Sequence, residues 1–246
     1  MNILTLNTWN VSGPWKERWQ VALAWIKKHK PEIVGFQELF DHEWAEEVRR
    51  ESGYANMVLG ESLSGLVWMS DFGLEAGECI QYKAKSPTED YFRYALYASV
   101  NTGAKKIHCF DTHLSWRIEE HETRSEQIDE LLAFVDQKAG NEPAVMVGDF
   151  NAAPENAEIR KISEKGSFTD AFLKLYPNEK GYTWDNASPY IQQASVKMPD
   201  RRIDYLFYRN WAGELGDLKQ VSVVMNQPTP AGVYASDHYG VLTQFG

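Results

Sequence analysis

Short apolar runs alternate with amphipathic stretches over the first part of the chain. The apolar run Ile3–Leu6 is followed by Trp15–Lys28, where apolar residues recur at the i, i+4 and i+7 spacing of one helix face. Pro31 comes next, and the apolar run Ile33–Phe36 begins just after it. Because proline lacks an amide donor and restricts the residue before it, the helix ends there. The pattern predicts a strand, a helix and a second strand.

The middle of the chain contains several short apolar runs that are separated by Gly, Ser, Pro or Asp. Runs of this length with turn residues between them are typical of antiparallel strands joined by hairpins. We therefore predict strands over all of them. The runs are Met57–Leu59, Leu66–Met69, Cys79–Tyr82, Tyr94–Val100 and Lys106–Asp111.

The C-terminal half predicts a long helix and further strands. Apolar residues lie on one face of Glu122–Lys138, which indicates a surface helix, and Ala144–Val147 reads as a buried strand. After a helical or irregular stretch, three more strands are expected at Ile203–Tyr208, Val221–Met225 and Tyr239–Thr243. No repeat or linker divides these segments, so we expect one domain over residues 1–246. Mixed sheets with helices outside, in a layered α/β sandwich, suit this order of elements.

Charge and composition narrow the classes of partner. The formal net charge is −10 at pH 7 and the sequence pI is near 5.1, so no positive field attracts a polyanion, and non-specific binding to duplex DNA is disfavoured. No apolar run is long enough to span a bilayer and the N-terminus lacks the pattern of a signal peptide, so we expect a cytoplasmic protein without stable membrane insertion. Cys79 and Cys109 lie in strand-like runs without zinc-site spacing, and we expect buried free thiols.

Polar residues interrupt the chain at the ends of six predicted strands, where a buried strand can present a functional side chain. Each alone has an ordinary structural explanation: Asn7 as a turn residue, Glu38 as a cap of the helix that begins near Asp41, His113 as a core histidine. Gly148–Asn151 is more specific, because glycine permits close backbone approach and Asp and Asn two residues apart point to one side. The six segments are Leu6–Trp9, Phe36–Glu38, Asp111–Leu114, Val147–Asn151, Arg202–Tyr205 and Ser236–His238.

In this order the six segments resemble the endonuclease/exonuclease/phosphatase superfamily, the relatives of deoxyribonuclease I. The matching marks run from Asn7 to His238: an Asn after the first strand, a Gln-Glu after the second, then Thr-His-Leu, Gly-Asp-Phe-Asn, Arg-Ile-Asp-Tyr and Ser-Asp-His. The resemblance implies a four-layered α/β/β/α sandwich of two packed, mixed and largely antiparallel sheets with helices outside. It also implies an enzyme that hydrolyses phosphate esters with the help of a divalent metal ion.

The metal ligands follow from the same resemblance and agree with the chemistry of hard cations. Mg²⁺ prefers oxygen ligands and commonly takes only one or two protein carboxylates together with water and substrate phosphate. By the resemblance, Glu38 is the principal ligand, Asn7 supplies an amide oxygen beside it, and Asp237 adds a second carboxylate. We therefore expect Mg²⁺ as the cofactor, with Mn²⁺ as a substitute.

The resemblance also assigns catalytic roles, which match what phosphate ester hydrolysis requires. Asp149 is expected to orient and deprotonate the attacking water, and Asn151 to donate to the developing oxyanion. His238 is expected to contact the phosphate, with Asp204 holding its ring and favouring its charged form. His113 is expected to be either a second phosphate contact or the acid near the leaving group.

Several features leave the substrate and some roles open. The leading hypothesis is a phosphodiesterase or phosphomonoesterase acting on a small-molecule or lipid head-group phosphate. The runner-up is a nuclease, although no basic element with interleaved aromatics is evident. A catalytically silent binding module is the alternative from another class, and the presence of Glu38, Asp149 and His238 argues against it. The oligomeric state is left open. Other candidates for the pocket are Arg117, Arg124, Arg201, Arg202 and Trp184, with Arg202 expected to face away from Asp204.

Overall fold

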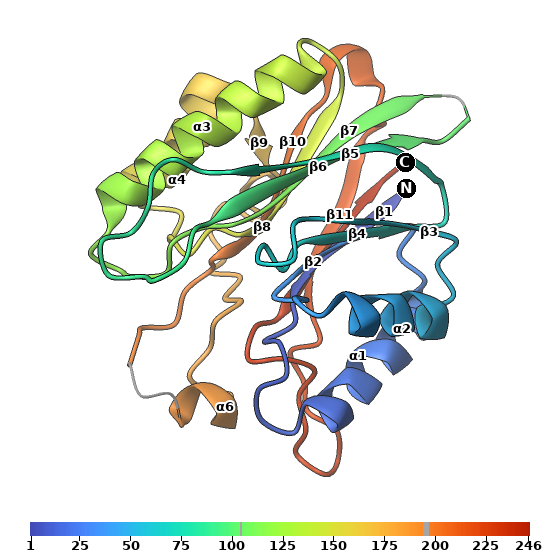
Figure 1. The fold of residues 1–246 in the computed structure, drawn as a ribbon, viewed down its shortest axis with the longest axis vertical. Coiled ribbons are helices and arrows are strands. Elements are labelled where there is room, and N and C mark those ends of the chain that lie inside the picture. Colours follow the sequence, from blue (N-terminus) through green and yellow to red (C-terminus); the bar gives the residue numbers. More distant parts are fainter. Residues whose placement is uncertain (104, 194–196) are drawn as a thin grey trace.

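A computed structural model of the chain shows two six-stranded sheets packed face to face, with helices on the outer face of each (Figure 1). The structure describes residues 1–103, 105–193 and 197–246. The layers follow the order helix, sheet, sheet, helix. This confirms the predicted four-layered α/β/β/α sandwich.

The first sheet has the strand order β11-β12-β1-β2-β4-β3. β1 and β2 are parallel and are joined through helix α1 (Trp15–His29), as the opening pattern of the sequence predicts, and the other neighbours are antiparallel. The strands are β1 (Asn2–Asn7), β2 (Ile33–Gln37), β3 (Asn56–Leu59), β4 (Val67–Ser70), β11 (Leu218–Val224) and β12 (Gly240–Phe245).

The second sheet has the strand order β5-β6-β7-β8-β10-β9. Its one parallel pair is β7 with β8, joined through helix α3 (His121–Ala139). Both sheets are therefore mixed and largely antiparallel. The strands are β5 (Gly73–Gln81), β6 (Tyr94–Asn101), β7 (Lys106–His113), β8 (Ala144–Asp149), β9 (Thr169–Asp170) and β10 (Asp204–Arg209).

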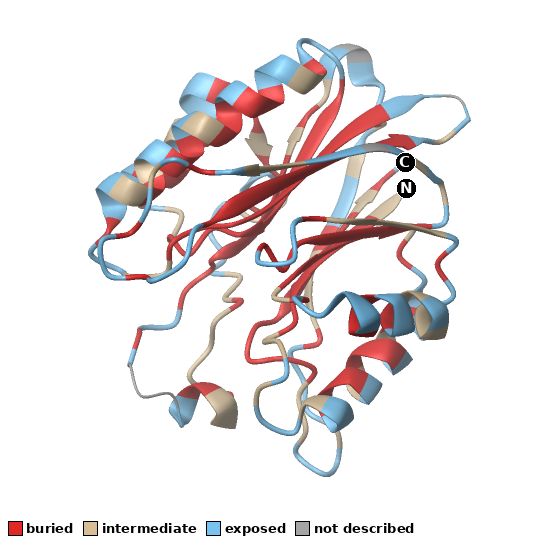
Figure 2. Ribbon diagram, viewed as in Figure 1, coloured by how far each residue is buried: buried red, intermediate tan, exposed pale blue. Residues whose placement is uncertain are grey.

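The helices bury one face each against a sheet (Figure 2). α1 and α2 (His42–Ser52) cover the first sheet, and α3 and α4 (Ala157–Gly166) cover the second (Figure 1). No helix in the described ranges is long and apolar enough to cross a membrane. The remaining helical turns are α5 (Ala171–Leu175), α6 (Pro189–Gln192) and the 3₁₀ turn η1 (Trp211–Gly213).

Helix α2 begins at its own cap. The Asp41 side chain accepts hydrogen bonds from the backbone N–H groups of Glu43 and Trp44, at 2.8 and 3.1 Å, and so satisfies donors that have no partner inside the helix. Glu38 is therefore not needed as the cap of this helix, which removes the ordinary structural explanation for that carboxylate.

Strand β5 is longer than the sequence predicted. It extends over Gly73–Gln81, whereas the apolar pattern indicated only Cys79–Tyr82. β5 is an edge strand that pairs with β6 alone, and its register shifts between the exposed residues Glu75 and Glu78. An edge strand with a bulge buries little side-chain surface, so it shows little hydrophobic alternation.

Candidate active site

Strand register carries the polar strand ends to one end of both sheets. In the first sheet, Asn7 lies opposite Gln37 at the ends of the parallel strands β1 and β2. In the second, Asp149 lies opposite His113 on one side and Asp204 on the other. Residues far apart in the sequence therefore meet because their strands end at the same level.

The turn before β12 joins this cluster from the other end of the chain. Thr5 lies opposite Val241 in the antiparallel pair β1–β12, so the residues just before β12 lie beside the end of β1. The Ser236 hydroxyl donates to the backbone carbonyl of Asn7, with 2.7 Å between the oxygens. This bond ties the Ser236–His238 turn to the first strand.

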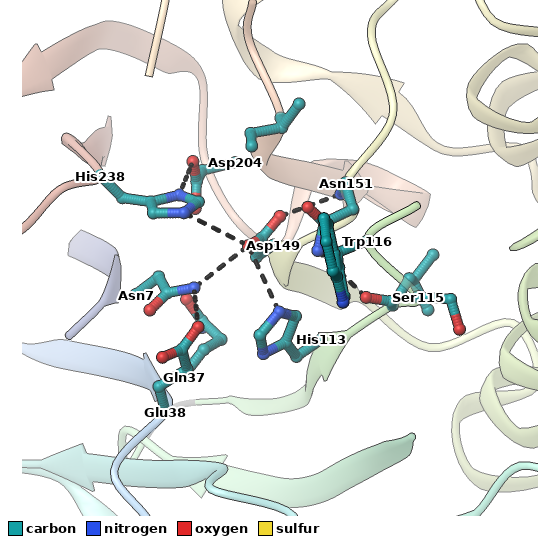
Figure 3. Close-up of polar contacts among 12 residues, drawn as sticks. Asn7, Gln37, Glu38, His113, Ser115, Trp116, Asp149, Asn151, Asp204 and His238 are labelled. Carbon is teal, nitrogen blue, oxygen red and sulfur yellow. Dashed lines mark hydrogen bonds and ion pairs between the residues drawn. The ribbon is translucent and has the colours of Figure 1, made fainter. Parts of the chain in front are cut away.

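Asp149 is the centre of the cluster (Figure 3). One carboxylate oxygen accepts from the backbone N–H of Asn151 at 2.9 Å. The other accepts from the side-chain amide of Asn7 at 3.1 Å and lies 3.4 Å from Nε2 of His113 and 3.7 Å from Nε2 of His238. Burial raises the pKa of Asp149 to about 7, against the lowering effect of His238.

Gly148 explains why Asp149 can sit there. Its φ is 136°, and a Cβ added to it would lie 1.9 Å from the backbone oxygen of Thr112. Only glycine allows β8 to approach β7 this closely. Asn151, two residues after Asp149, adopts the left-handed region with φ 52°, which turns the chain sharply out of the strand.

His238 is held by Asp204 from behind. Nδ1 of His238 and a carboxylate oxygen of Asp204 are 2.9 Å apart, and Asp204 is completely buried. Burial alone would lower the pKa of His238, but Asp204 and Asp149 outweigh it and hold the pKa well above the ordinary value. The two carboxylates therefore favour the charged form of the ring, whose Nε2 side faces Asp149.

His113 lies in the opposite electrostatic situation. Burial, together with the positive charges of Arg93 and His238, lowers the pKa of His113 well below its ordinary value. The surroundings thus favour the charged form of His238 and the neutral form of His113, on two sides of Asp149.

Glu38 and Asp237 supply the carboxylates at the other side of the cluster. Glu38 is half-buried and accepts from the Asn7 amide nitrogen at 3.1 Å, while the Asn7 amide oxygen accepts from the backbone N–H of Trp9 at 3.0 Å. The amide nitrogen of Asn7, and not its oxygen, therefore faces Glu38 in this structure. Burial raises the pKa of Asp237 to about 6, and the negative charge of Glu38 adds to the rise.

A second group of potential ligands lies next to these carboxylates. Asp149, Asp204 and His238 each bring one ligand atom within 4.8 Å of the others, a spacing that a metal ion can bridge. In the structure, Nδ1 of His238 is hydrogen-bonded to Asp204, so these three residues form a hydrogen-bonded chain in which Asp204 orients the ring.

A buried polar network connects the two sheets beneath the cluster. The side-chain amide of Gln37 donates to Asp111 at 2.7 Å and to the Thr5 hydroxyl at 3.1 Å. The second carboxylate oxygen of Asp111 has no partner among the described atoms. Burial raises the pKa of Asp111 well above its ordinary value, so the fold favours the protonated form of this carboxyl.

The cluster opens into a cavity of about 460 Å³. Six of the eight residues proposed from the sequence line it, whereas Asn7 and Asp204 lie behind as hydrogen-bonding partners. Trp184 also lines the cavity and packs edge-on against the ring of His238, with 5.1 Å between ring centroids. The six lining residues are Glu38, His113, Asp149, Asn151, Asp237 and His238.

The arginines separate into structural and cavity-lining groups. Arg124 is bonded to Glu158 and to backbone carbonyls, and Arg202 forms a two-fold ion pair with Asp170, away from Asp204 as expected. Of the four candidates, only Arg201 lines the cavity.

Arg93 also lines the cavity, and the sequence did not point to it. Its guanidinium forms a buried ion pair with Glu89 at 2.8 Å. No recognisable motif surrounds it, and the signal that locates it is the register that pairs Tyr94, its neighbour, with His113.

Solved structures share this fold at low sequence identity. TDP2 from D. rerio, solved with a single-strand DNA product, is 19% identical and covers 99% of this chain and 97% of its own, with a TM-score of 0.82. The beta toxin of Staphylococcus aureus is 18% identical, with full coverage of both chains and a TM-score of 0.76. Sphingomyelinase C from Streptomyces griseocarneus is 18% identical and covers 100% of this chain and 99% of its own, with a TM-score of 0.75.

The sequence itself identifies the family. No curated protein matches it significantly. The profile of the Endonuclease/Exonuclease/phosphatase family, however, matches residues 8–238, which includes all of the polar strand ends described above except Leu6 and Asn7. The chain therefore belongs to the endonuclease/exonuclease/phosphatase family and is a phosphoric ester hydrolase of the metal-dependent type.

Proposed function

We propose that this protein hydrolyses phosphate esters with Mg²⁺, or Mn²⁺ in its place, held by Glu38 and Asp237 with Asn7 beside them. The observation that carries the proposal is the polar cluster around Asp149, in which His113 and His238 flank this carboxylate at the floor of one cavity and Asn7 holds it from behind. A carboxylate base, an imidazole and oxygen ligands that line one cavity are the groups that metal-dependent phosphate hydrolysis requires.

The residues present fit a hard divalent cation. Glu38 and Asp237 both line the cavity, and their oxygen donors are the type that Mg²⁺ prefers. The raised pKa of Asp237 reflects a buried carboxylate with a second negative charge, Glu38, acting on it, and a bound cation would offset that repulsion. When bound, the metal ion supplies positive charge to the phosphate oxygens. For Asn7 to be a ligand, its amide must turn so that the oxygen faces Glu38.

The protein side chains then divide the remaining work. Asp149, held by Asn151 and Asn7, orients the attacking water and accepts its proton. Protonated His238 contacts the phosphate and stabilises the charge that develops on it. The amide nitrogen of Asn151 gives one hydrogen to the Leu114 carbonyl at 3.0 Å, which leaves its second hydrogen for the phosphate. Because His113 is neutral, it suits a phosphate contact better than a general acid.

The nature of the ester is a separate question. A small-molecule or head-group phosphate is favoured over nucleic acid because the net charge is −10, which repels a polyanion. A nuclease is the alternative, since one protein with the same fold was solved with a DNA product. A silent binding module is disfavoured, since the full hydrogen-bonded cluster is present.

Hydrolysis of bis-p-nitrophenyl phosphate tests the proposal. We expect turnover with Mg²⁺ or Mn²⁺, none with excess chelator, and loss of turnover in Asp149→Asn. Asp217→Asn, an exposed carboxylate paired only with Lys219, is the matched control and retains activity. Full activity in chelator contradicts the metal mechanism. Faster cleavage of an oligonucleotide, with a rate that falls steeply as salt increases, favours the nuclease instead.

A further inference from the structure

The walls of the cavity are mostly aromatic. Above the polar floor, Trp9, Phe40, Tyr91, Trp116 and Trp184 line it, with Met198 among them. Two arginines also lie in the wall: Arg93 is paired with Glu89, and Arg201 contacts the sulfur of Met198. The cavity therefore offers charge for one phosphate and apolar surface for whatever is attached to it.

Exposed apolar side chains continue this wall outward. Among the described residues, eight large hydrophobic side chains are exposed, and six of them lie in loops that leave the sheets at the active-site end. The six are Val11, Phe40, Leu63, Tyr91, Phe92 and Ile118. We call these six residues the apolar collar.

The strand register shows that the loops that carry the collar lie at the same end of the two sheets. The loop before β6 carries Tyr91 and Phe92, and β6 begins at Tyr94, opposite His113. The loop before β4 carries Leu63, and β4 begins at Val67, opposite Phe36 near the end of β2. The remaining members follow β1, β2 and β7 directly.

Two contacts tie members of the collar to neighbouring segments. The Phe40 ring packs on Gly65, in the loop that carries Leu63, and a Cβ on that glycine would lie 2.7 Å from the ring. The guanidinium of Arg93 lies 4.8 Å from the ring centre of Tyr91, which connects the loop before β6 to the cavity wall. By contrast Trp211, another exposed hydrophobic residue, follows the opposite end of β10.

We propose that the collar binds an apolar substituent of the substrate, so that the preferred substrate is a phosphate ester with a large alkyl or aryl group. This rests on the proposed phosphoesterase function. Apolar patches that continue into a binding cavity mark a binding surface, because burying them against a ligand is favourable. A polyanionic chain would instead require cations at these positions, and the collar residues carry none.

A series of esters with a constant leaving group tests the proposal. Methyl, butyl and hexyl p-nitrophenyl phosphate release the same p-nitrophenolate, so their reactivity is matched and only the apolar substituent changes. A fully buried methylene is worth about a fourfold change. We expect kcat/KM for the hexyl ester to exceed that of the methyl ester by at least about tenfold, because part of the chain stays in solvent. Equal values for the two esters overturn the proposal.

Variants locate the effect on the collar. Tyr91→Ser and Phe40→Ser are each expected to lower the hexyl-to-methyl ratio by about threefold or more. Trp211→Ser, an exposed aromatic at the far end, retains the ratio. Thermal unfolding checks that all three variants fold. An unchanged ratio in both collar variants overturns the assignment to these residues.

Binding separates this proposal from the proposed function. Hexylphosphonate and methylphosphonate cannot be hydrolysed as esters, and their binding can be followed through tryptophan fluorescence, since Trp9, Trp116 and Trp184 line the cavity. If no ester is hydrolysed but hexylphosphonate binds at least about tenfold more tightly, the catalytic function fails and the collar remains. If both phosphonates bind equally, the collar proposal fails whatever the turnover.

Discussion

Replacing Asp204 by Asn tests whether this carboxylate orients and charges His238. Asp204 is completely buried, and one of its oxygens lies 2.9 Å from Nδ1 of His238. Its other oxygen has no partner among the described atoms, so its bond to His238 is the main polar contact of the carboxylate. Asparagine has nearly the same shape and keeps an acceptor oxygen, but it removes the negative charge.

The expected cost follows from the role of the pair in catalysis. Removing the carboxylate that orients a catalytic histidine lowers kcat by about 10⁴-fold in a well-studied site. Asparagine retains a neutral hydrogen bond, which is about half as strong as a charge-assisted one. We therefore expect about a hundredfold decrease in kcat or more, which is about 3 kcal/mol of transition-state stabilisation.

The assay is kcat for bis-p-nitrophenyl phosphate in the wild type, Asp204→Asn, His238→Ala and the double variant. His238→Ala is expected to cost at least as much as Asp204→Asn. Since the two side chains act as a unit, the double variant is expected to be no slower than the poorer single variant. Near-UV circular dichroism checks that the fold is retained. Costs that multiply in the double variant refute the pairing, because they show that the two side chains work independently.

Three further predictions concern the metal ligands, the buried network and the loops. Glu38→Gln and Asp237→Asn are each expected to raise the Mg²⁺ concentration for half-maximal rate by about tenfold or more, measured by metal titration. Because the folded protein keeps a proton on Asp111 where the unfolded chain loses it, the free energy of unfolding falls as pH rises above about 4. Asp111→Asn cannot ionise, so in urea denaturation it should match the wild type at pH 4 and exceed it at pH 8. Arg18 donates to five backbone carbonyls, those of residues 8, 9, 10, 12 and 235. Arg18→Lys should therefore lower the free energy of unfolding by about 2 kcal/mol or more. An unchanged urea midpoint would contradict this.

Local sequence determined the elements and the identity of the strand-end residues. Helix α1 is apparent because its apolar side chains recur with the helical period, and the central strands are apparent as short apolar runs that are buried on both faces. The polar interruptions Asn7, Glu38, His113 and Asp149 are apparent because a buried strand ends in each case. Strand β5 was largely missed, since an edge strand with a bulge has no such period to read.

Only the tertiary structure decided which side chains meet. Arg201 and Arg202 are neighbours in the sequence, but Arg201 lines the cavity and Arg202 is paired with Asp170. Arg93 reaches the cavity through the pairing of β6 with β7, which no local pattern shows. The charges of His113 and His238 also depend on neighbours supplied by other strands. Hydrophobic period is a property of neighbouring residues in the chain, whereas contacts and pKa values depend on distances between strands, which are set when the two sheets pack.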